Sequence, residues 1–530
     1  MGNEIPVGET APRPNATATA RTGDTGFGED ASAGRSARGL KTGVLHLASS
    51  VAFGVASAAP AYCLAATVGW IDGDVRLAGP FLMMVGFIPM LLVVSAYYYW
   101  NRTDPDCGEA FIWSARAFGA RIGWVVGFAA VASSVMVMAN LVQVAALYMF
   151  LSLHLYGLAN SAFWVTVAGT ACIVLVTAFI ALGSRMAVGL QYVLVVMQIV
   201  PLVVFSVLSF YRVVVYHPQG SASPQLSWFF STHISAGSLA PAIIYVVFLY
   251  WGWDAVLAAN EETSNSSRLP GLSAVLSTLC LVVIYVVVTA ALQTYRGAGF
   301  LIASPNDVFS PVARGMMGNF DTVLLLSVSV SGIASALTTL MPLTRQTLSM
   351  AAHGSIPNVF GRIHERFLTP FSGTIILGVL SIFWYLLLTI WNPKAIYDSI
   401  DGLGVLVAVT YGGTGLAATV YFRHELRRSV KNFLFLGLFP SLGAAMFAVI
   451  MVITLWEGFQ VGNTSGSIQS ETSFLGIGGV FLIPVATLCV GIGFAIVLAV
   501  RRPGFFRRPA ETWPGEGVTL PYEDERVEEE

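Results

Sequence analysis

The feature that most constrains this chain is a series of long apolar stretches, each of about the length that crosses a lipid bilayer. A membrane-spanning helix needs about 20 consecutive, mostly apolar residues. Twelve such stretches are present, and Asp254 is the main charged residue inside them. They are Val44–Trp70, Leu77–Trp100, Gly123–Phe150, Ala162–Leu182, Met186–Tyr211, Leu239–Ala259, Leu272–Gln293, Thr322–Thr344, Gly373–Trp391, Leu403–Phe422, Phe433–Leu455 and Phe474–Val500.

The composition excludes a soluble globule. Hydrophobic residues make up 55% of the chain and charged residues 11%, whereas soluble domains carry about 25% charged residues. This small number of charges cannot cover a water-facing surface. The chain must therefore be solvated by a bilayer. No basic stripe is large enough to neutralise a nucleic-acid backbone, so nucleic acid is excluded as a partner. The sequence therefore predicts an all-α polytopic membrane protein.

The basic residues test the number of spans. If both tails and every second loop face the cytoplasm, that side holds 22 of the 27 Lys and Arg residues and the opposite side holds 5. Cytoplasmic loops carry an excess of Lys and Arg, and a wrong number of spans would mix the two sides. The sequence predicts twelve spans in the cytoplasmic membrane, with both termini inside the cell.

The first span contains a run of small residues that ends in a proline. It reads Gly54-Val55-Ala56-Ser57-Ala58-Ala59-Pro60. Pro60 removes a backbone donor and clashes with the preceding turn, and Gly54 adds backbone freedom. Irregular backbone inside a membrane survives where it lines a cavity, so this pattern indicates either a substrate path or close helix packing.

The sixth span has a second candidate break. It reads Phe248-Leu249-Tyr250-Trp251-Gly252-Trp253-Asp254, with a glycine between bulky aromatic residues. Asp254 falls where a second half-helix would begin. Its carboxylate would either cap the free amide groups there or act as a proton carrier or counter-ion, since a carboxylate in a membrane is costly.

The two candidate breaks lie five spans apart, which is the spacing of two inverted five-helix repeats. The expected organisation is therefore a disordered cytoplasmic tail, two repeats, two additional helices and a second cytoplasmic tail. The corresponding residues are 1–42, 43–213 and 237–422, 431–500, and 501–530. Free N–H and C=O groups at the broken helix ends would suit a zwitterion without any charged side chain.

Three stretches resemble the amino acid–polyamine–organocation (APC) superfamily. The first is the small-residue run that ends at Pro60. The second, Phe248–Val275, has an aromatic-Gly-aromatic-acid pattern, then Glu-Glu, then a basic residue and a proline. The third, Leu343–Pro370, has an Arg-rich segment, Gly-x-x-Pro and a closing Thr-Pro. Cys107–Gly123 is also similar to the amphipathic loop before the family's third span.

This resemblance implies a permease that moves a small solute by alternating access, as a symporter or an antiporter. It implies substrate contacts in three spans, with Phe248 at the position of a gating aromatic. The residues concerned are Ala56, Ser57 and Ala58 in the first span, Ser133, Ser134 and Met138 in the third, and Phe248, Trp251 and Gly252 in the sixth. Asn140 and Gln143 are polar residues within the third span, and interhelical hydrogen bonds are their expected role.

Two further groups of residues are candidates for gating and coupling. Glu261 and Glu262 end the sixth span, where ion pairs with Arg268, Arg345 or another loop arginine would close the cytoplasmic side. Proton-coupled relatives often carry a lysine midway along the fifth span, but this chain has Gln198 there, and glutamine does not titrate.

Sodium coupling is a second alternative. Ser327, Ser331 and Ser335 recur every four residues, so they share one helix face and supply oxygen ligands that suit a hard cation. Exchange without an ion is a third alternative. The coupling ion, H⁺ or Na⁺, therefore stays open, and no cofactor or structural metal site is expected.

Among substrates, an amino acid fits best and a polyamine or other amine ranks second. The aromatic residues around the second break favour an apolar amino acid or a cation held over a ring face, and a polyamine would need more acids than Asp254. The sequence has none of the motifs expected of a membrane enzyme, namely HExxH, GxSxG, a histidine pair or clustered intramembrane carboxylates. A non-transporting sensor with the same broken helices is the remaining alternative.

Overall fold

The structure consists almost entirely of helices. It is a computed structural model that describes residues 36, 38, 40, 42–230, 234, 236–303, 307–461 and 470–508, which belong to one compact unit. Most of the N-terminal tail predicted to be disordered (1–42) and residues 509–530, including the acidic end of the second tail, lie outside the described residues. The prediction of an all-α polytopic membrane protein is confirmed within this part of the chain.

The α-helices are α1 Leu47–Ser57, α2 Pro60–Val75, α3 Gly79–Thr103, α4 Ala110–Phe118, α5 Ala120–Ser152, α6 Tyr156–Ala159, α7 Ala162–Leu182, α8 Ser184–Tyr216, α9 Ala236–Leu249, α10 Ala255–Ala258, α11 Leu269–Ile302, α12 Phe309–Met317, α13 Asp321–Ala352, α14 Phe371–Trp391, α15 Ala395–Tyr421, α16 Val430–Asn432, α17 Phe439–Phe459, α18 Gly479–Arg501 and α19 Pro503–Phe506. The shorter elements are the 3₁₀ turns η1 Arg76–Ala78, η2 Leu226–Trp228, η3 Asn260–Glu262, η4 Gly318–Phe320, η5 Asn358–Gly361 and η6 Glu425–Arg427, the π-helical turn η7 Phe433–Leu438, and the strands β1 Ser473–Phe474 and β2 Ile477–Gly478.

Eleven segments within the described residues are long and apolar enough to cross a membrane. The segment missing from the twelve expected is the sixth, because it is interrupted. There α9 ends at Leu249, residues 250–254 form turns, and α10 is a single turn of four residues. The twelve-span count and the relation between the two repeats therefore stay predictions.

The break in the first span lies where its sequence indicated. Helix α1 ends at Ser57, Ala59 adopts the left-handed conformation at φ 47°, and Pro60 begins α2. Proline suits the first position of a helix because the N–H that it lacks would have no partner there. The small residues on both sides of Pro60 allow the chain to bend sharply within a packed bundle.

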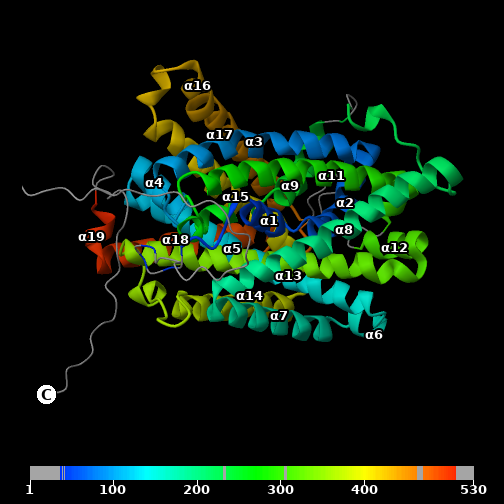
Figure 1. The fold of residues 1–530 in the computed structure, drawn as a ribbon, viewed down its shortest axis with the longest axis horizontal. Helices are drawn as coiled ribbons and strands as arrows, with labels where there is room; N and C mark the ends of the chain where they lie inside the picture. Colours follow the sequence, from blue (N-terminus) through cyan, green and yellow to red (C-terminus); the bar gives the residue numbers. More distant parts are fainter. Residues whose placement is uncertain are drawn as a thin grey trace, which may run out of the picture. The chain divides into compact units, whose positions relative to one another are not determined.

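Helices α4 and α12 lie at opposite ends of the helix bundle. Figure 1 shows α4 beside α19 at one end, and α12 near α6 at the other. The sequence had predicted an amphipathic loop at Cys107–Gly123, and the structure has the helix α4 there, with its apolar side chains buried. Helix α12 was not predicted, because its apolar residues are interrupted by Ser310, Pro311 and Arg314.

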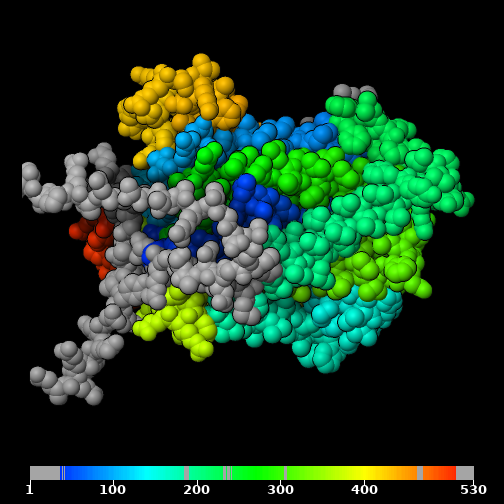
Figure 2. Space-filling model, in the orientation of Figure 1, coloured from blue at the N-terminus to red at the C-terminus, as the bar shows by residue number. Residues whose placement is uncertain are grey.

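The outer surface of the bundle is apolar, as a lipid-facing surface must be. Helix α8 crosses the face seen in Figure 2. It exposes a row of valines at helical spacing, each at least half exposed: Val193, Val196, Val200, Val203, Val207 and Val214. Such an extended exposed apolar surface is foreign to soluble monomers, so it supports insertion into a bilayer.

Candidate functional site

The two interrupted spans meet at their breaks. Gly252 lies at φ 103°, where residues with a side chain are strained, and a Cβ atom there would lie 3.1 Å from the Ser57 carbonyl oxygen. Only glycine allows the two backbone segments to come this close without displacing one of them. The backbone of α1 and the turn after α9 are therefore adjacent in the middle of the bundle.

Hydroxyl groups from two other helices bind the backbone groups that the breaks release. The Tyr285 hydroxyl of α11 lies 2.6 Å from the Leu249 carbonyl oxygen and 3.2 Å from that of Ala58, so it connects both breaks. Ser335 of α13 donates to the Ser57 carbonyl at 2.7 Å. Backbone groups in a bilayer must find internal partners, and these side chains supply them.

A small cavity, the break cavity, lies against the two breaks. Its volume is about 30 Å³, enough for about two water molecules on the scale where one needs 10–15 Å³. Of the predicted contacts, Ser57, Ser133, Ser134, Trp251 and Gly252 line it. The other lining residues are Glu109, Ala130, Asp254, Ala255, Thr338, Thr339, Pro342, Gln346 and Thr410.

Four predicted substrate contacts do not line the break cavity. Ala56 and Ala58 lie at the first break but are fully packed, with exposed fractions of 0% and 1%. Met138 is also fully buried and is not among the residues that line this cavity. The fourth, Phe248, lies in a layer of side chains above the cavity.

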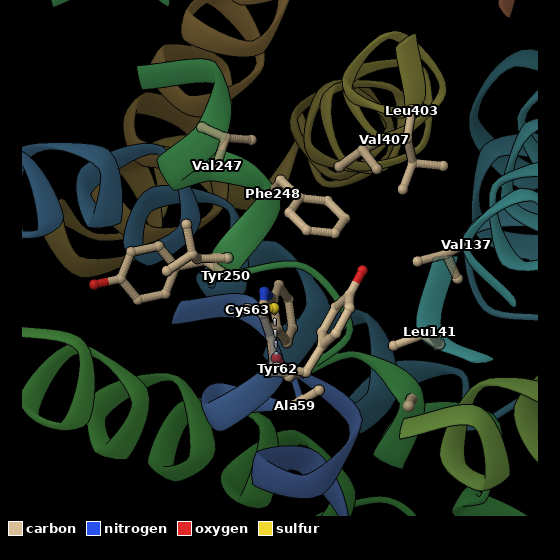
Figure 3. Close-up of a cluster of buried hydrophobic side chains, with 14 of the residues drawn as sticks. Ala59, Tyr62, Cys63, Val137, Leu141, Val247, Phe248, Tyr250, Leu403 and Val407 are labelled. Carbon is tan, nitrogen blue, oxygen red and sulfur yellow. Dashed lines mark hydrogen bonds between the residues drawn. The ribbon is translucent and has the colours of Figure 1, made fainter. Parts of the chain in front are cut away.

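This aromatic layer consists of Tyr62 and Phe248. The two rings point toward one another from α2 and α9, with centroids 6.5 Å apart, and Val137, Leu141, Leu403 and Val407 surround them (Figure 3). Tyr62 donates a hydrogen bond to the Asn140 amide oxygen of α5. The sequence had indicated Phe248 but not Tyr62. A single tyrosine in a run of apolar residues looks the same as a residue that only packs against its neighbours.

Beyond the aromatic layer lies a larger cavity of about 220 Å³, the vestibule. Along the first span the order is Ser57 at the end of α1, then Tyr62 and Ala66 in α2, which places the Tyr62 ring between a residue of the break cavity and one of the vestibule. Phe248 has the same place between Trp251 and Tyr245. The vestibule is lined by Ala66, Thr67, Trp70, Asn140, Gln143, Val144, Leu147, Tyr245, Lys394, Tyr397, Ile400, Asp401 and Glu471.

The predicted interhelical hydrogen bonds of α5 are confirmed. Asn140 accepts one from Tyr62, and Gln143 accepts one of 2.5 Å from Tyr385 of α14. Both amides also line the vestibule. These two residues therefore connect α5 to its neighbours and present polar groups to the cavity.

Ion pairs close the opposite end of the site. Arg345 of α13 makes a two-pronged contact with Glu262, at 3.0 Å and 3.2 Å, and both side chains are 1% exposed. Glu261 pairs with Arg38. The predicted ion pair between Glu262 and Arg345 is present, whereas Arg268 is exposed and forms no ion pair with a described residue.

Arg38 and Asp106 extend this group, and the sequence had not singled out either residue. Arg38 Nη2 lies 2.5 Å from Asp106 Oδ2, and Ser349 donates to Asp106 Oδ1 at 2.6 Å. Burial alone would raise the pKa of Asp106, but the adjacent Arg38 guanidinium holds it well below its usual range. We call Arg38, Asp106, Glu261, Glu262 and Arg345 the inner ion-pair cluster.

Of the two roles considered for Asp254, the structure contradicts capping of α10. Asp254 has helical backbone angles, and its side chain makes no capping hydrogen bond. The carboxylate instead accepts a 2.7 Å hydrogen bond from the Tyr411 hydroxyl, and the Gly252 N–H donates to that same hydroxyl at 3.2 Å. Tyr411 thus joins Asp254 to the second break.

A second carboxylate, Glu109, lines the break cavity with Asp254. Glu109 is 1% exposed, and its Oε1 atom has no hydrogen-bond partner among the described residues. Burial, and then the negative charge of Asp254, raise the pKa of Glu109. The sequence analysis missed this residue because Glu109 lies in the predicted loop Cys107–Gly123 rather than in a span.

Gln198 occupies the place considered for a coupling lysine. Its side chain is fully buried, and its amide oxygen accepts a 2.6 Å hydrogen bond from Ser331. The Ser331 oxygen also accepts from the Tyr62 N–H of α2 at 3.3 Å. Ser327 instead donates to the Leu324 carbonyl of its own helix. Gln198, Ser331 and Ser335 therefore connect α8, α13 and the first break.

Comparisons with known proteins agree on one type of protein. The profile of the amino acid permease family matches residues 44–496. The low-affinity putrescine importer PlaP of Escherichia coli (strain K12) is 22% identical over 387 residues, 72% of this chain and 82% of that protein. The human cationic amino acid transporter 4 is 22% identical over 380 residues, 64% of this chain and 54% of that protein. The methylthioribose transporter of Bacillus subtilis (strain 168) is 24% identical over 213 residues, 39% and 43% of the two chains.

Proposed function

Because the chain belongs to the amino acid permease family, we propose that it is a secondary active transporter that moves an amino acid across the cytoplasmic membrane by alternating access. In this proposal the chain has twelve spans, and the first ten form two inverted repeats. Both termini face the cytoplasm, as the distribution of basic residues indicates.

The observation that carries this proposal is the meeting of the two broken spans at Ser57 and Gly252. In a bilayer, such irregular backbone lines a path for solute. The backbone groups at the breaks are bound by hydroxyls of Tyr285, Ser335 and Tyr411. A substrate can exchange its own polar groups for these hydroxyls, so binding costs few hydrogen bonds.

Alternating access gives the two ends of the site different roles. The inner ion-pair cluster closes the end that we assign to the cytoplasm, and the vestibule opens toward the other end. The break cavity is too small for an amino acid, so the rings of Tyr62 and Phe248 must separate before a substrate reaches the breaks. Breaking the inner cluster would then open the path inward.

The coupling ion is the part of the proposal that transport assays must decide. Gln198 cannot carry a proton, and Ser331 and Ser335 already donate their hydroxyl hydrogens to protein oxygens. Sodium between α1 and α13 would have to displace those contacts. Proton coupling through the carboxylates Glu109 and Asp254 and exchange without an ion are the alternatives.

The test is uptake by the full-length protein in liposomes, compared with protein-free liposomes. Labelled amino acids and polyamines are supplied under a proton gradient, a sodium gradient, or with unlabelled solute preloaded inside. We expect saturable uptake of at least one amino acid, and the condition that drives it identifies the coupling. Saturable binding without flux under all three conditions would contradict transport and favour a sensor.

A second candidate substrate is a polyamine or another amine. The observation that favours it is Asp401, a carboxylate in the vestibule that sequence reasoning did not single out. A proton-driven or exchange uptake of a diamine, with no uptake of neutral amino acids, would select this alternative.

A further inference from the structure

The vestibule contains a carboxylate that no basic side chain neutralises. Asp401 of α15 lines it and forms no ion pair with a described residue, while the Tyr245 hydroxyl hydrogen-bonds to it. Lys394 and Glu471, which also line the vestibule, pair with each other at 2.8 Å and are partly exposed. Asp401 is therefore an acidic side chain of the vestibule that is left without an ion-pair partner among the described residues.

The neighbouring Asp398 shows what a structural carboxylate looks like in this part of the chain. It is fully buried, and it accepts hydrogen bonds from the backbone N–H groups of Glu471 and Thr472, at 2.7 Å and 2.8 Å, and from the Thr472 hydroxyl. Those bonds satisfy both oxygens and hold the segment before β1. Asp401, three residues later, has no such backbone partners and faces the cavity instead.

The walls around Asp401 are suited to an organic cation. Trp70, Tyr245 and Tyr397 bring aromatic rings to the same cavity, and ammonium groups are attracted to ring faces. Asn140 is 2% exposed, and its amide nitrogen has no hydrogen bond to a described residue, although its oxygen is bound by Tyr62. This nitrogen can donate to a polar atom elsewhere on the same ligand.

We propose that the vestibule binds the primary ammonium group of a cationic substrate, with Asp401 as its counter-ion and the three aromatic side chains as its walls. The proposal rests on the proposed transport function and names the substrate class: amines and amino acids with a positively charged end. Binding here places the substrate directly above the Tyr62–Phe248 layer, before that layer opens.

The experiment compares lysine with norleucine, which lacks only the terminal ammonium group, and adds 1,4-diaminobutane. Binding is measured by competition on the purified full-length protein in nanodiscs, so the result does not depend on transport. We expect the wild type to bind lysine more tightly than norleucine. Asp401→Asn should weaken the binding of lysine and diaminobutane by about tenfold or more, since it removes the charged partner of the ammonium group, and leave the binding of norleucine unchanged.

Two further variants act as controls. Asp401→Glu keeps the charge and should retain most of the preference for lysine. Lys394→Gln removes the competing cation and should leave cation binding intact or strengthen it. The proposal would be overturned if the wild type bound lysine and norleucine with equal affinity. It would also be overturned if Asp401→Asn lost the same affinity for all ligands, or lost no affinity for any of them. Cation binding that depends on Asp401, together with no flux in liposomes, would overturn transport and leave the ammonium site standing.

Discussion

At the scale of single residues, the site depends on one glycine and a few hydroxyls. Gly252 allows the backbone of the sixth span to touch Ser57, and Tyr285 and Tyr411 bind the groups that the breaks release. Neither tyrosine is recognisable in the sequence, because each belongs to an apolar helix in which an aromatic side chain is expected to pack. Their role follows from which backbone group they reach.

Replacing Gly252 by alanine should abolish transport. The new Cβ atom would lie 3.1 Å from the Ser57 carbonyl oxygen, at a φ value that L residues avoid, and forcing such a residue costs about 1–3 kcal/mol. The measurement is initial uptake of the amino acid that the wild type transports. Gly73→Ala is the matched control, since that glycine has no neighbour within 4 Å, and its uptake should match the wild type. Normal uptake by Gly252→Ala would remove the close approach from the mechanism.

Replacing Glu109 by glutamine should change how stability depends on pH. The pKa of Glu109 is raised by burial and by Asp254, so the folded protein holds this proton to a higher pH than the unfolded chain. Wild-type stability should therefore fall, by at most about 1.4 kcal/mol per pH unit, as pH rises above the unfolded pKa of about 4.3. Melting temperatures between pH 5 and 8 should decline less in Glu109→Gln. A variant of the exposed Glu365 should retain the wild-type slope, and an unchanged slope in Glu109→Gln would contradict the assignment.

At the scale of elements, one helix connects most parts of the site. Helix α13 supplies Ser331 and Ser335 to the first break, and Arg345 to Glu262 at the end of the sixth span. Its serine repeat indicated a polar face in the sequence, and its arginine suggested an ion pair. Which acid it meets is decided by how α13 packs against α10 and η3, two short elements that no periodic pattern defines.

Breaking the ion pair between Arg345 and Glu262 should strongly destabilise the protein. Both side chains are 1% exposed, and removing one partner of a buried pair typically costs about 3–5 kcal/mol because the other charge stays buried. We expect Arg345→Met to lower the melting temperature sharply, and Arg345→Met/Glu262→Leu to recover much of the loss. Arg428→Met, which breaks the exposed pair with Glu425, should cost no more than about 0.5 kcal/mol. Equal effects of the two arginine variants would contradict a buried, closing role.

At the scale of the whole molecule, the distribution of charge and the positions of the cavities agree on a polarity. The ion pairs of the inner cluster lie at one end of the site, and the vestibule with Asp401 lies at the other. In the proposed topology, which rests on the excess of basic residues, the first end faces the cytoplasm. Substrate entering from outside would then meet Asp401 first and the inner cluster last.

Labelling from outside the cell tests this polarity. In a background with Cys280→Ser and Cys489→Ser, Phe320→Cys should react with a membrane-impermeant maleimide in intact cells. Phe320 is 70% exposed and precedes α13. Arg423→Cys, at an exposed position after α15, should react only after permeabilisation. The reverse pattern would invert the topology, and labelling of both positions in intact cells would contradict the expected number of spans between them.

The sequence by itself determined the membrane-embedded helical fold, the two breaks, and Ser57, Trp251 and Gly252 as residues of the site. Those conclusions depend on hydrophobic length, on proline and glycine, and on the family resemblance, all of which are local in the chain. Tertiary structure alone decided the contacts of Tyr62, Tyr285, Arg38 and Glu109, because these residues act on groups tens to hundreds of positions away. A contact between distant segments leaves no periodic signal. The tertiary structure also excluded the capping role considered for Asp254, whose carboxylate accepts a hydrogen bond from Tyr411 rather than from the amide groups of its own short helix.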